Sequence, residues 1–151
     1  MTASAASLVA PATGTAILAP VFALAAWTLV PLLMIAYRRL QAGFNGTVAP
    51  REYALGESGC VPPAVSLPNR NYMNLLELPL LFYVVCLIAF VTGSASGAVI
   101  ALAWGYVALC VVHSLIHITY NHVLHRFLAF ASRNVALLVI WVLVGAAVFG
   151  S

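Results

Sequence analysis

The sequence predicts an all-α membrane protein, built as a bundle of four transmembrane helices. Of its 151 residues, 64% are hydrophobic and only 6% are charged, whereas about 25% of a typical soluble domain is charged. The mean hydropathy is +1.09. The apolar residues gather into four runs, each near the roughly 20 residues that a helix needs to cross a bilayer. A soluble globule of this length could not bury so much apolar surface, so lipid must cover it.

The four runs follow one another along the chain and form one domain. The first run carries Pro20 and Pro31, which membrane helices tolerate when neighbouring groups satisfy the freed backbone. The second run is interrupted by Pro79 in the same way. We expect the four transmembrane helices at about residues 15–37, 71–92, 97–120 and 127–149.

The connections between the spans differ in length and character. The first, residues 38–70, is a long polar segment rich in glycine and proline, a composition typical of loops. The second is a tight turn at residues 93–96, and the third lies around residues 121–126. No linker or internal repeat divides the chain, so residues 1–151 are expected to form a single domain.

The basic residues predict how the chain is oriented in the membrane. All six are arginines that lie in or beside the first or third connection: Arg38, Arg39, Arg51, Arg70, Arg126 and Arg133. Because positively charged segments stay in the cytoplasm, we expect the long first loop there and both termini on the opposite side. The alanine-rich composition without lysine fits a bacterial inner membrane. Arginines spread in this way form no phosphate-binding patch, so no nucleic acid is expected as a partner.

The three cysteines, Cys60, Cys86 and Cys110, do not indicate a disulfide framework. Their number is odd and none of them forms a Cys-x-x-Cys pair, so neither a set of disulfides nor a zinc ribbon is expected. Cys86 and Cys110 lie inside apolar runs, where a thiol behaves as a small hydrophobic group.

A polar cluster opens the second span. Arg70, Asn74 and Glu77 are spaced by four and three residues, which places them on one face of a helix. A carboxylate within the membrane needs a cation or a proton, so Glu77 should meet a partner from another helix or subunit. The cluster is either a ligand site or a polar clamp between helices.

A second polar cluster closes the third span. His113, His117, Tyr120 and Asn121 share one helical face. The spacing of the two histidines also fits a metal pair, and Glu77 could add a carboxylate ligand. No Glu-x-x-His repeat or aspartate completes such a centre, so we do not predict a metal. The histidines either make hydrogen bonds between helices or contact a ligand.

Arg126 opens the fourth span. The free N–H groups of a helix N-terminus favour an anion, and an arginine there adds a fixed positive charge. Such a place suits a thiolate, a carboxylate or a phosphate. Alternatively, Arg126 is a membrane-boundary residue that extends its charge to the aqueous interface.

These residues resemble the signature of the MAPEG family, the membrane-associated proteins in eicosanoid and glutathione metabolism. The similarity lies in Arg70-x-x-x-Asn74-x-x-Glu77, in His113 of the third span and in Arg126 of the fourth. The four spans, the long first loop and the chain length are also similar. The histidine-rich segment that follows His113 looks like a divergent bacterial branch of the family.

The resemblance implies a homotrimer that binds glutathione in a cleft between neighbouring subunits. Arg70, Asn74 and Glu77 would contact the tripeptide, and Arg126 would stabilise its thiolate as the catalytic residue. Arg38, near the end of the first span, would also contribute. His113 belongs to the same site.

Two positions depart from the pattern that glutathione-using members commonly share. Cys110 stands where they carry an arginine, three residues before His113, and His117 stands where they carry a tyrosine. His117 or Tyr120 could replace that tyrosine in the glutathione site.

The resulting hypothesis is a glutathione-dependent transferase or peroxidase that acts on a lipophilic electrophile or a lipid hydroperoxide reaching it through membrane lipids. One alternative is a MAPEG-like protein without chemistry, which binds lipid or serves as an accessory subunit. Another is a histidine- or metal-dependent enzyme that uses His113, His117 and Glu77. A channel or transporter is disfavoured because one short subunit with few charges offers little for a pathway.

Overall fold

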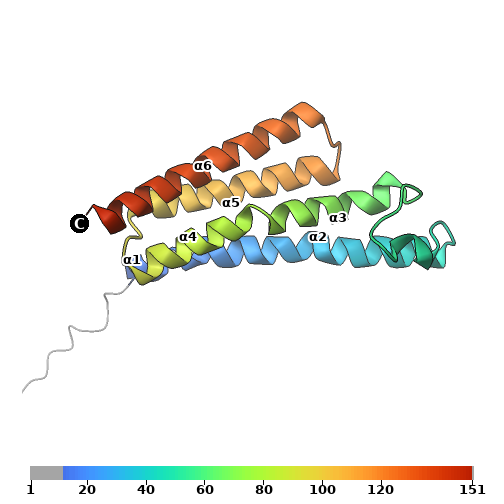
Figure 1. The fold of residues 1–151 in the computed structure, drawn as a ribbon, viewed down its shortest axis with the longest axis horizontal. Coiled ribbons are helices and arrows are strands. Elements are labelled where there is room, and N and C mark those ends of the chain that lie inside the picture. Colours follow the sequence, from blue (N-terminus) through green and yellow to red (C-terminus); the bar gives the residue numbers. More distant parts are fainter. Residues whose placement is uncertain (1–11, 151) are drawn as a thin grey trace, which may run out of the picture.

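The computed structural model describes residues 12–150, which form an elongated bundle of helices (Figure 1). A short helix, α1 (Ala12–Thr15), precedes the long helix α2 (Leu18–Phe44). A loop with one 3₁₀ turn, η1 (Pro50–Tyr53), leads to α3 (Pro63–Leu76) and α4 (Pro79–Val91). The helices α5 (Gly97–Ile118) and α6 (Val123–Phe149) complete the chain.

Within residues 12–150, four helical segments are long and apolar enough to cross a membrane: α2, the pair α3 and α4 taken together, α5 and α6. The side chains that face away from the bundle include many large apolar ones, such as Phe22, Leu33 and Leu138. Lipid can cover such a surface, since the backbone groups in the interior of a helix are hydrogen-bonded to one another. The predicted class, an all-α membrane protein with four spans, is confirmed.

The helices extend further into the first connection than the sequence predicted. α2 continues to Phe44 instead of ending near residue 37, and α3 begins at Pro63 instead of near residue 71. With 27 residues, α2 is about 40 Å long, which exceeds a hydrocarbon core of about 30 Å. The connection itself is therefore shorter than predicted and covers residues 45–62. The third span is slightly shorter than predicted, because α5 ends at Ile118 instead of near residue 120.

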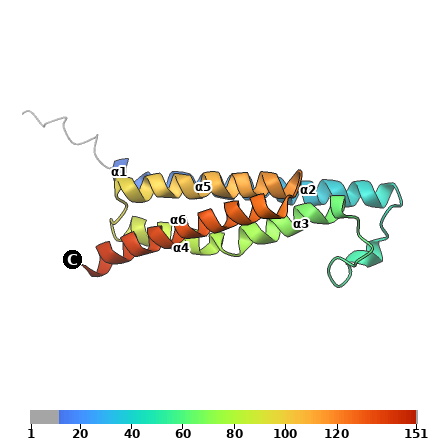
Figure 2. The same cartoon turned by 90° about the horizontal axis from the view of Figure 1, so that it is seen from above.

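The connections alternate between the two ends of the bundle, as Figures 1 and 2 show. The loop 45–62 and the α5–α6 connection lie at one end, here called the loop end, while α1, the α4–α5 turn and the last turn of α6 lie at the other. Residues 1–11 and Ser151 lie outside the described range, so the predicted side of the two termini concerns residues that the structure does not describe.

The hydrophobic core fills the half of the bundle away from the loop end. Leu24, Phe82, Tyr106 and Ile140 are fully buried there, one from each span. The rings of Phe82 and Tyr106 stack with their centroids 4.5 Å apart. Apolar packing therefore fixes this half of the bundle. The buried polar side chains around the cavity gather in the other half, which also holds a smaller apolar cluster of Ala42, Val48, Val61 and Val65.

The second span is broken between α3 and α4. Pro79 has no N–H to donate to the carbonyl group four residues earlier, and its ring disfavours a continuous helix. The backbone deviates at Glu77, where ψ is −93°, far from the helical value of about −42°. Hydrogen bonds resume with Leu80 N–H to the Glu77 carbonyl, at 3.2 Å. The break places the end of α3 inside the membrane-spanning region.

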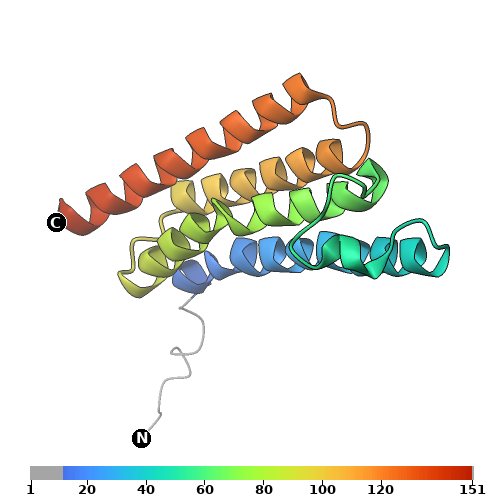
Figure 3. The same ribbon diagram turned by 45° about the vertical axis from the view of Figure 1, so that its right-hand side comes forward.

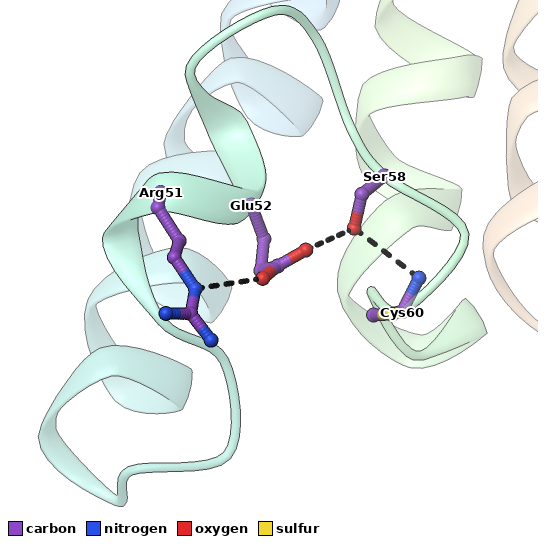
Figure 4. Close-up of polar contacts among 4 residues, drawn as sticks. All are labelled: Arg51, Glu52, Ser58 and Cys60. Carbon is purple, nitrogen blue, oxygen red and sulfur yellow. Dashed lines mark hydrogen bonds and ion pairs between the residues drawn. The ribbon is translucent and has the colours of Figure 1, made fainter.

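The loop 45–62 is tied to the bundle by its charged side chains. Arg39 of α2 forms an ion pair with Glu57 at 3.0 Å and lies over the ring of Tyr53, 4.7 Å from its centroid. Within the loop, the hydroxyl of Ser58 donates to Glu52 at 2.6 Å, and Arg51 Nε donates to the same carboxylate at 3.3 Å (Figure 4). These contacts restrict the loop 45–62 and attach it to α2.

The hydrogen bond from Ser58 to Glu52 predicts how the stability of the folded loop depends on pH. This bond and, to a smaller extent, Arg51 lower the pKa of the Glu52 carboxyl below its usual value of 4.5. Because a lowered pKa stabilises the folded loop only while the group is charged, this contribution is complete above pH 4.5 and is lost as the pH falls through the lower, folded pKa. We expect Ser58→Ala to raise the pKa of Glu52 more than Arg51→Gln does. Carboxyl ¹³C NMR titration, assigned with a Glu52→Gln control, measures this, and an unchanged pKa in Ser58→Ala would contradict it.

Candidate functional site

A cavity of about 410 Å³ lies between α3, α5 and α6 in the polar half of the bundle. In Figure 3 the first turns of α6 stand apart from α5, while α3 passes below both. Polar side chains from all three helices and three apolar ones from α6 form the wall: Arg70, Asn74, His113, His117, Val123, Arg126, Phe127 and Phe130.

The helical repeat explains why these side chains meet. Arg70 and Asn74 of α3, His113 and His117 of α5, and Arg126 and Phe130 of α6 are each four residues apart. Each pair therefore lies on one face of its helix, and the three faces converge on the cavity. The wall contains two guanidinium groups, two imidazoles and an amide, and it contains no carboxylate. Its chemistry therefore suits an anion.

Arg126 is oriented by the turn that precedes α6. Its Nη1 atom donates to the side-chain oxygen of Asn121 at 2.9 Å. Asn121 adopts a φ of 47°, a left-handed conformation that asparagine tolerates better than most residues. Arg126 is the fourth residue of α6, so its charge adds to the free N–H groups of the first helical turn. The start of α6 is the most favourable place for an anion on this wall.

His113 is fixed by the backbone of the same turn of α6. Its Nδ1 atom lies 3.1 Å from the carbonyl oxygen of Arg126. A carbonyl oxygen only accepts hydrogen bonds, so Nδ1 carries the proton and, in the neutral ring, Nε2 is an acceptor. Nε2 is buried and has no hydrogen-bond partner within residues 12–150. His113 therefore offers an oriented, unused proton acceptor beside the cavity.

Two asparagines secure α3 against its neighbours. Asn71 is fully buried and its amide donates to the Ser114 hydroxyl of α5 at 2.6 Å. Asn74 donates to the backbone carbonyl of Arg70 at 2.9 Å, along its own helix. The first bond fixes the distance between α3 and α5, and the second turns the side chain of Asn74 along the cavity wall.

Three residues that the sequence placed in the site do not line this cavity. Arg38 is exposed on α2, and Glu77 is exposed at the break that follows α3. Tyr120 lies beyond the end of α5, where its hydroxyl is 3.1 Å from His125 Nδ1. It borders a neighbouring surface pocket together with Asn121 and residues 122–124 and 127. The single chain thus brings together Arg70, Asn74, His113, His117 and Arg126 only.

Arg133 is fully buried within α6, whereas the sequence prediction counted it with the charges beside the third connection. It is the eleventh residue of α6, about 15 Å from the start of that helix. Its guanidinium contacts Cys110 Sγ at 3.9 Å and the Asn74 carbonyl at 3.4 Å, and it lies 4.9 Å from the centroid of the Phe130 ring. The sequence held one sign that Arg133 belongs with the site. It follows Arg126 by seven residues, which places both side chains on one face of a helix.

The described residues contain no group of three or more histidine, cysteine, aspartate or glutamate side chains that could hold a metal ion. His113 and His117 lie near each other, with ring centroids 5.8 Å apart. Glu77, the third member of the metal hypothesis, is not part of the cavity wall. The geometry of residues 12–150 therefore gives the metal hypothesis no third ligand.

Comparison with known proteins decides the family. The sequence profile of the MAPEG family matches residues 17–146, a range that includes the first three spans and most of the fourth. The chain belongs to the MAPEG family. No curated protein and no solved structure matches the chain, so this membership stands on the family profile. It confirms the predicted resemblance and agrees with the observed four-helix membrane bundle.

The structure shows which side chain lies next to Cys110, where this chain departs from the pattern of glutathione-using members. Glutathione-using MAPEG members commonly carry an arginine at this position of the third span. Here the guanidinium of Arg133 reaches the sulfur of Cys110 from α6. This MAPEG protein therefore keeps an arginine side chain next to that point of α5, although a different helix provides it.

Proposed function

We propose that this MAPEG protein is a glutathione-dependent transferase or peroxidase that acts on a lipophilic electrophile or a lipid hydroperoxide. The observation that carries the proposal is the position of Arg126, which Asn121 orients at the start of α6 on the wall of an acid-free cavity. Arg70 is the second guanidinium on the same wall and suits a glutathione carboxylate, which an arginine can bind through two hydrogen bonds.

The chemistry follows from the two groups that converge near the sulfur. A free thiol has a pKa of about 8.5 and is largely protonated at neutral pH. A guanidinium beside the sulfur favours the thiolate, and Nε2 of His113 is available to accept the thiol proton. In the transferase reaction the thiolate attacks an electrophilic carbon, the bond to the leaving group breaks, and the leaving group departs with its electron pair. The proton on His113 then returns to solvent or to that group.

The peroxidase reaction uses the same thiolate. Its sulfur attacks the outer oxygen of a hydroperoxide, the oxygen–oxygen bond breaks, and the inner oxygen takes a proton to leave as an alcohol. A second glutathione then reduces the sulfenic acid, which yields glutathione disulfide and water. Lipophilic substrates can approach through the bilayer, because apolar side chains of α6 form part of the cavity wall: Val123, Phe127 and Phe130.

Glutathione binding to the detergent-purified chain tests this function. We expect calorimetry to detect glutathione binding. We also expect turnover of glutathione when chlorodinitrobenzene or cumene hydroperoxide is supplied as the electrophile. Replacing Arg126 with alanine should lower turnover about 100-fold, the order found when one charge-stabilising donor is removed. Arg70→Ala should weaken binding. Arg51→Ala, which removes an exposed loop arginine, is the matched control and should change neither.

Two results would contradict the enzyme. Unchanged thiol-transfer turnover in Arg126→Ala would remove the assigned catalytic residue. Absence of binding at millimolar glutathione would favour the alternative, a MAPEG-like protein without chemistry that holds lipid or serves as an accessory subunit. Lipid that copurifies stoichiometrically with such a chain would support that alternative.

We further propose that the protein assembles as a homotrimer. The carboxylate of Glu77 is exposed on the single chain at the α3–α4 break, within a membrane-spanning segment, and makes no ion pair in the described residues. An acidic side chain facing lipid costs about 2.5–3.5 kcal/mol, so a cation from a neighbouring subunit would stabilise it. Arg38, also exposed, is a candidate for contact across that interface.

Light scattering that separates protein mass from detergent mass tests the assembly. We expect a protein mass of three chains of 15.9 kDa, and Glu77→Gln should favour smaller species. Glu57→Gln, which removes a carboxylate already paired within the chain, is the control. A monomer or dimer for the wild-type protein would refute the trimer.

The orientation that we propose places the loop 45–62 in the cytoplasm, in a bacterial inner membrane. Cys60 lies in this loop and is exposed, whereas Cys86 and Cys110 are buried. We therefore expect a membrane-impermeant maleimide to label inverted inner-membrane vesicles and not intact spheroplasts. Cys60→Ser should abolish the labelling. Labelling of intact spheroplasts would place the loop outside and reverse the topology.

A further inference from the structure

Two arginines lie on one face of α6 at different depths. Arg126 is in the first turn, and Arg133 follows seven residues later, about 10 Å further into the membrane region. Phe130 lies between them on the same face and contacts Arg133 through its ring, 4.9 Å from the guanidinium. The proposed catalytic mechanism uses only the outer arginine.

The inner arginine carries a charge that the described chain does not neutralise. Arg133 is fully buried, and its contacts in residues 12–150 are a thiol, a backbone carbonyl and an aromatic ring, all uncharged. Its Nε atom is buried and has no hydrogen-bond partner there. A guanidinium remains protonated in proteins, so Arg133 is a buried positive charge without a counter-ion among residues 12–150.

This charge lies directly behind the cavity wall. Asn74 and Phe130 line the cavity and also contact Arg133, which is not itself part of the lining. Water screens little inside the bundle, so a charge acts over a longer distance there than at a protein surface. An anion in the cavity would be attracted by Arg133 without touching it.

We propose that Arg133 is a positioning residue that determines ligand specificity, because its unneutralised charge makes the cavity favour the most negatively charged form of its ligand. This inference rests on the proposed function, under which that form is the thiolate of glutathione rather than the thiol. Arg133 then acts together with Arg126, the outer arginine contacting the anion and the inner one raising the potential around it. The thiol proton leaves to His113 or to solvent.

The simpler role for Arg133 is structural. Its bond to the Asn74 carbonyl links α6 to the last turn of α3, and removal of that link alone could loosen the cavity. A purely structural role would weaken all ligands alike. A role in charge selection would change the preference between ligands that differ only in the charge at sulfur.

A pair of glutathione analogues separates these roles. S-methylglutathione carries no charge at sulfur, and glutathione sulfonate carries a permanent negative charge there. Calorimetry on the full-length, detergent-purified protein should show that the wild type prefers the sulfonate about tenfold, as expected for one attractive charge at reduced screening. Arg133→Gln should lower this preference several-fold, although Arg126 still contacts the charged group, with little change in the affinity for S-methylglutathione. Arg133→Lys should retain the preference.

A second variant keeps the test decisive if Arg133→Gln does not fold. Cys110→Asp places a carboxylate beside the guanidinium, because the sulfur it replaces lies 3.9 Å from Arg133 Nη1. It should neutralise the charge and reduce the preference for the sulfonate, whereas Cys110→Asn, similar in shape but uncharged, should preserve it.

The possible failures are distinguishable. If neither analogue binds the wild-type protein, the proposed function fails and the role of Arg133 fails with it. If both bind, and the preference is either absent in the wild type or unchanged in Arg133→Gln and Cys110→Asp, glutathione binding stands and only the selection by Arg133 is refuted.

Discussion

The buried guanidinium of Arg133 links the three helices that form the candidate site. A charge inside a membrane protein is costly unless polar groups compensate it. Here the compensation comes from Asn74 of α3, Cys110 of α5 and the ring of Phe130 on α6 itself. The C-terminal end of α3 adds its partial negative charge, since the carbonyl groups of a helix end point outward unpaired. The arginine is therefore stabilised only where these three helices meet.

The break after α3 makes this arrangement possible. A continuous helix through the second span would place its carbonyl groups in intrahelical bonds and would present no helix end at this depth. Pro79 ends α3 at Leu76, and the Asn74 carbonyl then accepts from Arg133. Membrane proteins tolerate such irregular backbone where protein buries it or where it lines a cavity. In this chain the break adjoins a cavity whose wall holds two guanidinium groups, two imidazoles and an amide, and no carboxylate.

The two halves of the bundle differ in the side chains that they bury. Apolar side chains from all four spans pack together away from the loop end and provide the hydrophobic stability. The opposite half holds Asn71, His113, His117 and Arg133, the buried polar groups around the cavity. Several of their polar atoms, both nitrogens of His117 among them, have no hydrogen-bond partner in the described chain. Such groups are expensive to bury, which fits a region that a polar ligand completes.

The sequence by itself determined the membrane class, the four spans and the resemblance to the MAPEG family, because long apolar runs and residues at helical spacing depend only on local order along the chain. The same spacing predicted that Arg70 would share a face with Asn74, and His113 with His117. Tertiary structure decided the rest. Tyr120 does not share the helical face of His117, because α5 ends at Ile118. Glu77 does not share the face of Asn74, because the backbone turns there before Pro79. Arg133 was counted with the loop charges, since hydropathy and charge rules cannot tell an arginine beside a membrane surface from one held by neighbouring helices. That distinction depends on contacts between residues far apart in the sequence, which only the packed bundle provides.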